Sequence, residues 1–179
     1  VRKYTTAQEV ETELRGQIER ARKFGIDPTH FDTHMLCAVS DTRFVPVLLR
    51  LGREYKVPVL LTPEAIKKWI DFDLKPFITE KDIVVDKLFM AFPEDYTKGM
   101  DNFYSGILQS LKPGLSCILL HAGYDGEEMR GIMQEHTGYG AAWRQDDFNF
   151  FTSEKCKKLL LEQNIKLITW REIRDKLLR

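Results

Sequence analysis

Apolar residues recur at helical spacing near the start of the chain. Val10 and Leu14 lie four residues apart, as expected for the buried face of an amphipathic helix. Before them, Thr6 and Glu9 have the spacing of a capping box, in which the hydroxyl and the carboxylate satisfy the first free amides of a helix. The pattern predicts a first helix that begins after Thr6 and ends near Gly25.

The rest of the chain alternates predicted helices with short extended runs. Helices are predicted over residues 44–55, 63–69, 98–111, 127–135, 141–151, 154–163 and 170–178. Extended segments or strands are predicted over residues 30–34, 57–61, 115–120 and 165–168, whereas residues 83–85 fit either a strand or a loop. The run from Leu115 to Leu120 is continuously apolar, which is typical of a parallel strand covered on both faces.

This alternation predicts a parallel α/β fold with four or five βα units. A complete (β/α)₈ barrel takes about 250 residues. The 179 residues of this chain therefore predict a distorted or incomplete TIM-type barrel, with an open doubly wound sheet as the alternative. We predict one α/β domain over residues 1–179, because no stretch is typical of a linker. The sequence begins with Val1 rather than methionine, so we expect that upstream sequence has been left out.

Composition narrows the choice of partners. The chain has 27 basic and 27 acidic residues, and this balance argues against nucleic acid as the main partner. No run approaches the roughly 18 apolar residues that span a membrane, and no basic-then-apolar leader is present. Cys37, Cys117 and Cys156 are odd in number and far apart, so they predict neither a disulfide framework nor a zinc knuckle. We expect a reducing, cytoplasmic location and no membrane partner.

Two motifs place histidines where strands are predicted to end. In His30-Phe31-Asp32-Thr33-His34, alternate residues of an extended chain share one face, so two imidazoles and a carboxylate lie together. These groups are natural ligands of a divalent cation. The structural alternative is that His30 and Asp32 form a buried hydrogen-bonded pair.

The second motif is His121, which directly follows the apolar run that ends at Leu120. Reactive groups of a parallel sheet gather at the carboxyl ends of its strands. Histidine titrates near neutrality, which suits a general acid that protonates a leaving group. The alternative is a histidine that caps a helix or bonds a loop carbonyl.

Other polar and aromatic residues are weaker candidates. His136 is interpreted as a charge at a helix end, and Asp146 and Asp147 as a solvated face or an internal salt bridge. The large aromatic residues of the predicted helices are interpreted as core: Trp69, Trp143, Phe148, Phe150 and Phe151.

Four blocks of the sequence occur together in an order typical of one family. The blocks are Glu13–Gly25 with Pro28–His34, Leu111–Gly114 with Leu119–Tyr124, Arg144–Ser153, and Ile165–Glu172. In their order and spacing they resemble the YdjC-like carbohydrate deacetylases over nearly the whole chain. The resemblance implies a distorted (β/α) barrel that removes N-acetyl groups from amino sugars or chito-oligosaccharides with one divalent metal ion, Mg²⁺ or Zn²⁺.

The resemblance also implies roles for individual residues. His34 matches a metal ligand, and His121 matches a proposed catalytic acid that would protonate the departing amine. His30 and Asp32 match the rest of the first block, where they would support the metal ligand.

Two further residues of the matching blocks, Tyr124 and Arg144, are candidates for binding the sugar. Some family features have no counterpart here: an N-terminal Asp-Asp motif is absent, and Ala122 stands where proline is usual. A second reading is therefore an inactive family member that acts as a carbohydrate-binding or structural protein. A third is an unrelated metal-dependent barrel enzyme, such as an isomerase. A homodimer is plausible, because an incomplete barrel exposes apolar edges.

Overall fold

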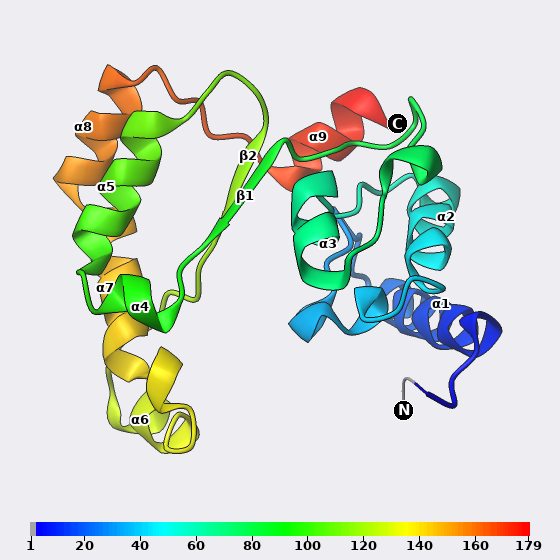
Figure 1. Ribbon diagram of the computed structural model, residues 1–179, viewed down its shortest axis with the longest axis horizontal. Helices are drawn as coiled ribbons and strands as arrows, with labels where there is room; N and C mark the ends of the chain where they lie inside the picture. Colours follow the sequence, from blue (N-terminus) through cyan, green and yellow to red (C-terminus); the bar gives the residue numbers. More distant parts are fainter. Residues whose placement is uncertain (1–2) are drawn as a thin grey trace. The chain divides into compact units, whose positions relative to one another are not determined.

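The computed structural model describes residues 3–179 and divides the chain into two compact units (Figure 1). The first unit combines the chain up to Lys87 with the C-terminal residues Ile168–Arg179, and the second comprises Leu88–Leu167. The single domain over residues 1–179 therefore stays a prediction.

The first unit is built mainly of helices. They are α1 (Ala7–Lys23), the 3₁₀ segment η1 (His34–Val39), α2 (Val45–Tyr55), α3 (Pro63–Ile70), η2 (Lys75–Phe77) and α9 (Trp170–Leu177). The predicted capping box is present, since Glu9 Oε2 accepts from the Thr6 amide at 2.7 Å and Thr6 Oγ1 accepts from the Glu9 amide at 3.2 Å. The helix predicted after Thr6 is thus confirmed, with its cap.

Among the described residues of the first unit, the extended segments form one isolated bridge. Phe31 forms a parallel bridge with Val59, in which the Phe31 amide donates to Pro58 and the Leu60 amide donates to Phe31, both at 2.8 Å. The strand predicted over 57–61 is therefore reduced to this bridge, and the extended segment predicted over 30–34 ends at Thr33, directly before η1. Pro58 has no N–H to extend a ladder, and the chain turns into η1 at His34. Residues 83–85 lie in a loop, one of the two alternatives for them.

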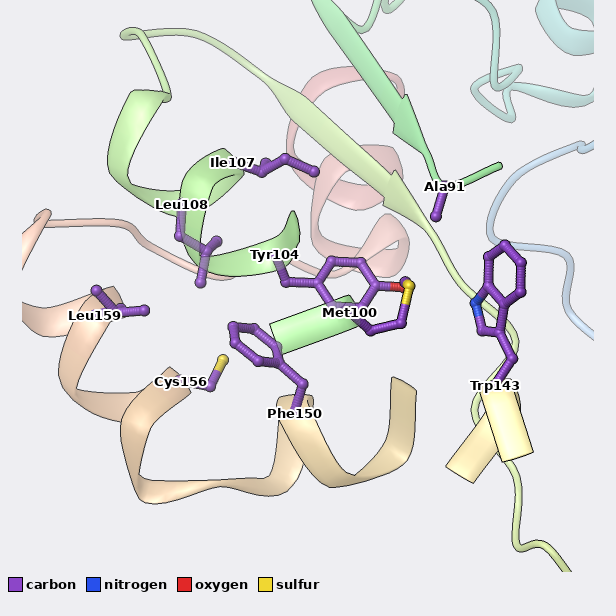
Figure 2. Close-up of a cluster of buried hydrophobic side chains, with 9 residues drawn as sticks. All are labelled: Ala91, Met100, Tyr104, Ile107, Leu108, Trp143, Phe150, Cys156 and Leu159. Atoms are coloured by element: carbon purple, nitrogen blue, oxygen red, sulfur yellow. The ribbon is translucent and has the colours of Figure 1, made fainter. Parts of the chain in front are cut away.

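The second unit contains a small sheet and a helical layer. Its elements are β1 (Lys87–Met90, which begins at the last residue of the first unit), α4 (Pro93–Tyr96), α5 (Met100–Ser110), β2 (Ser116–Leu119), α6 (Glu127–Ile132), η3 (Thr137–Tyr139), α7 (Ala141–Thr152) and α8 (Glu154–Glu162). β1 and β2 pair as a two-stranded parallel sheet (Figure 2). Helices α5, α7 and α8 pack against one another.

The core of the second unit lies between these helices and the sheet (Figure 2). Its buried members are Ala91, Met100, Tyr104, Ile107, Leu108, Trp143, Phe150, Cys156 and Leu159. Trp143 and Phe150 are confirmed as core residues. A separate core in the first unit is formed by Val39, Val45, Leu48, Leu49, Val59, Leu61, Ile66 and Leu74.

The α/β class is confirmed, but the count of strands is not. Over residues 3–179 the regular strands are β1 and β2, so the expectation of four or five βα units is wrong. β1 was not predicted, and the strand predicted over 165–168 is irregular chain in which Leu167 is 80% exposed. A strand depends on a hydrogen-bonded partner, which an apolar run cannot specify. The barrel stays a prediction. Among the described helices, none is long and apolar enough to cross a membrane.

Candidate functional site

The candidate residues fall into two groups, one in each unit. In the first group, His30 is half-buried, and its ring stacks on Trp170 with 4.7 Å between centroids and 9° between planes. Thr29 Oγ1 lies 3.2 Å from His30 Nδ1. Burial lowers the pKa of His30 below its ordinary value of 6.5, whereas the nearby carboxylate of Asp32 raises it by less. His30 is therefore set to be neutral near pH 7.

The side chains of Asp32 and His34 are both exposed. Between them, Thr33 is buried, and its Oγ1 accepts a hydrogen bond of 2.7 Å from the Ala38 amide. The chain reverses directly after His34, because Met35 and Leu36 have φ angles of 52° and 57°, in the left-handed region that few non-glycine residues adopt. The segment thus ends in a tight turn that leaves His34 and Asp32 open to a ligand.

In the second group, His121 follows β2 and is exposed. Its main-chain amide and carbonyl are both hydrogen-bonded to side chains of α7. The His121 amide donates to Asp147 Oδ2 at 3.0 Å, and its carbonyl accepts from Arg144 Nη1 at 3.4 Å. The Gly123 amide donates to the carbonyl of Arg144 at 3.0 Å. One helix therefore fixes the loop after β2 while the imidazole stays exposed.

Asp147 is the main residue that the sequence interpretation missed. It is 1% exposed, and its Oδ1 accepts a hydrogen bond of 2.6 Å from the Tyr104 hydroxyl. Burial, together with this carboxylate, raises the pKa of Tyr104 well above 10. A signal was present in the sequence, because Trp143, Asp147 and Phe150 have the spacing of one helix face. Asp147 therefore lies on the core face, not on a solvated one.

The remaining candidates lie beside His121 in the second unit. Tyr124 is 69% exposed, and its ring is 4.8 Å from that of Phe148. Arg144 is partly buried, and its Nε is a buried donor for which the described residues provide no acceptor. An exposed aromatic face suits a ring-shaped ligand, and the other nitrogens of the Arg144 guanidinium are hydrogen-bond donors.

The described part of the chain provides few donors for a metal ion that lie close together. Over the described residues, no group of three His, Cys, Asp or Glu side chains lies close enough together to hold a metal ion. His34 and Asp32 are available donors in the first unit and His121 in the second. The described residues alone therefore do not form a complete metal site, and the metal stays a prediction.

Comparison with known proteins gives the family. The model of the YdjC-like protein family matches residues 2–162. The chain belongs to the YdjC-like family. Its YdjC-like relatives include proteins named carbohydrate deacetylase from Thermoanaerobacter pseudethanolicus (27% identical, covering 90% of this chain and 59% of the relative) and from Thermus thermophilus (29% identical, 96% and 62%). A third, from Halalkalibacterium halodurans, is 26% identical over 90% of this chain and 59% of its own length.

A solved structure supports the same fold. A protein from Enterococcus faecalis V583, described as a candidate cellobiose-phosphate cleavage protein, superposes with a TM-score of 0.75 at 20% identity. The match covers 96% of this YdjC-like chain and 63% of the other. The chain thus spans about three fifths of the length of these relatives.

Proposed function

We propose that this chain is part of a metal-dependent carbohydrate deacetylase that hydrolyses the N-acetyl group of amino sugars or chito-oligosaccharides. The observation that carries the proposal is the similarity, over 90–96% of this chain, to three relatives that are named carbohydrate deacetylase. The histidine placed after a parallel strand, with its main chain fixed and its ring exposed, supports the same chemistry.

His121 is proposed as the general acid. Cleavage of an amide requires that the departing amine receive a proton, and a histidine side chain is a group that can supply it. The contacts from Asp147 and Arg144 to the main chain of His121 leave both ring nitrogens free of the bonds that hold the loop. Tyr124 is proposed to lie against the sugar ring, and Arg144 to donate to a sugar oxygen.

The metal is proposed as one Mg²⁺ or Zn²⁺ ion with His34 as one ligand. Asp32 and His30 are proposed to support that ligand, since Asp32 is exposed two residues away and His30 is set to be neutral. The described residues do not complete the ligand set. We further propose that the chain forms part of an incomplete barrel, acts in the cytoplasm and associates as a homodimer.

The test is the rate of acetate release from N-acetylated chito-oligosaccharides by the intact protein, with Mg²⁺ or Zn²⁺ supplied. The His121→Ala variant is compared with His136→Ala, which removes the other histidine of the second unit, an exposed one that lies outside the proposed site. We expect a loss of roughly 10²–10⁴-fold, the usual contribution of a general acid, for His121→Ala only. Equal activity of the two variants would refute the role of His121, and binding of the sugar without hydrolysis would instead support the inactive, carbohydrate-binding reading.

A further inference from the structure

The last helix, α9, contacts the segment that carries the first pair of candidate histidines at three points. The ring of Trp170 stacks on His30. One turn later, Arg174 Nη1 donates to the main-chain carbonyl of Pro28 at 2.6 Å and pairs with Asp27 Oδ2 at 2.8 Å. Residues four apart on a helix share a face, so one face of α9 contacts this segment.

Arg174 is 2% exposed, so its charge depends on partners within the protein. A buried charge is costly unless it is paired and hydrogen-bonded. Its Nε binds Asp175 at 2.7 Å, and its Nη1 binds the carbonyl and carboxylate described above. Arg171 also pairs with Asp27, at 3.2 Å, but that pair is exposed and contributes little. Displacing the segment from Arg174 would leave a buried guanidinium without two of its partners.

The C-terminal half of the segment is held by a main-chain bridge and by a side-chain hydrogen bond. Phe31 is bridged to the chain around Val59, and Thr33 accepts from the Ala38 amide. Fixed points therefore flank Asp32 and precede His34. The exposed residue Asp32 lies between the two held residues Phe31 and Thr33, and the exposed residue His34 follows Thr33.

We propose that Trp170 and Arg174 are positioning residues, which hold the chain from Asp27 to His30 so that the following residues Asp32 and His34 are presented in one geometry. The consequence for catalysis rests on the proposed function, in which His34 binds the metal. The positioning itself does not, because it concerns the order of the segment in the protein alone.

Hydrogen exchange of single backbone amides tests the positioning directly. The Leu36 amide donates to Thr33 at 3.0 Å and the Phe31 amide to Pro58, so both report on the segment. We expect Trp170→Ala to speed exchange at these amides about tenfold or more by local opening. Amides of α2 should change less than about twofold, because they do not depend on this opening.

Conservative and control variants sharpen the comparison. Trp170→Phe keeps a ring against His30 and should restore slow exchange. Arg174→Lys keeps the charge but loses the fork that reaches two partners, so it should speed exchange at Phe31. Lys176→Ala alters an exposed residue of the same helix and should leave the segment unchanged.

The outcomes separate this proposal from the proposed function. Unchanged exchange in both Trp170→Ala and Arg174→Lys would overturn the positioning, as would an equal rise throughout α2. If the intact protein releases acetate, kcat/KM should fall on the order of tenfold in Trp170→Ala and recover in Trp170→Phe. If the intact parent releases none, the proposed function fails, and the exchange result still decides the positioning.

Discussion

Removing the carboxylate of Asp147 should destabilise the second unit and disturb the loop that carries His121. Two donors lose their acceptor in Asp147→Ala: the Tyr104 hydroxyl, which is fully buried, and the His121 amide, which is partly buried. A buried donor without a partner costs about 1–3 kcal/mol. Water can reach the amide more easily than the hydroxyl, so we expect a total loss of about 2–4 kcal/mol in the free energy of unfolding.

Asp147→Asn separates the two bonds. The amide oxygen can still accept from His121, and the amide nitrogen can donate to the Tyr104 oxygen, which leaves the hydroxyl hydrogen and the second amide hydrogen without an acceptor. We expect a loss of about 1–2 kcal/mol, smaller than that of Asp147→Ala. Tyr104→Phe removes the same bond from the other side. In a double-mutant cycle of Asp147→Asn and Tyr104→Phe, we expect a coupling energy of about 1–2 kcal/mol.

The assay is urea denaturation followed by circular dichroism, in which the change in midpoint gives the change in free energy. Asp146→Ala is the matched control, because it removes an exposed acid from the preceding position of α7. It should change the free energy of unfolding by less than about 0.5 kcal/mol. If Asp147→Ala were no more destabilising than Asp146→Ala, the account of Asp147 as a buried anchor would be refuted.

Three further predictions concern the first unit. Gly52→Ala should lower the free energy of unfolding by about 1–3 kcal/mol through overpacking, because the new Cβ would lie 2.6 Å from Val59 Cγ2. Gly16→Ala meets open space within α1 and should instead raise the free energy of unfolding by about 0.5–1 kcal/mol. Thermal unfolding of both variants would contradict this account if the two melting temperatures shifted in the same direction. Thr62→Ala removes the buried cap of α3 and should cost about 1 kcal/mol in a urea titration, so no change would show that the cap is dispensable. The lowered pKa of His30 means that the unfolded chain binds more protons below pH 6.5, so stability should fall as the pH drops from 7 to 5; His30→Gln should reduce this slope, and an unchanged slope would argue against the burial of the ring.

Helices were predictable because their signals are local. The capping box at Thr6 and the proline that follows Thr62 both mark the observed starts of helices. In each case the threonine side chain accepts a hydrogen bond from a main-chain amide in the first turn. Such signals depend on neighbours in sequence, so they hold wherever the helix is packed. Strands depend on distant partners, and the apolar run at 165–168 therefore gave a false prediction while β1 was missed.

The sequence pointed to the exposed residues of the candidate site, but not to the buried residues that hold their segments in place. His34, Asp32 and His121 stood out as polar groups near the ends of extended runs, and all three are exposed. Arg174 is a charged residue whose burial shows only when distant segments come together. A sequence suggests that charged residues are solvated unless their spacing places them on a core face, as it does for Asp147.

The central claim is tested most directly by mass spectrometry of the sugar. The intact protein is incubated with an N-acetylated chito-oligosaccharide and Mg²⁺ or Zn²⁺, and the products are compared with those of the His121→Ala variant. The account predicts that the parent protein yields a sugar that has lost an acetyl group and gained a free amine, whereas the variant yields little or none. Recovery of the unchanged sugar from the parent protein, with either metal, would contradict the account.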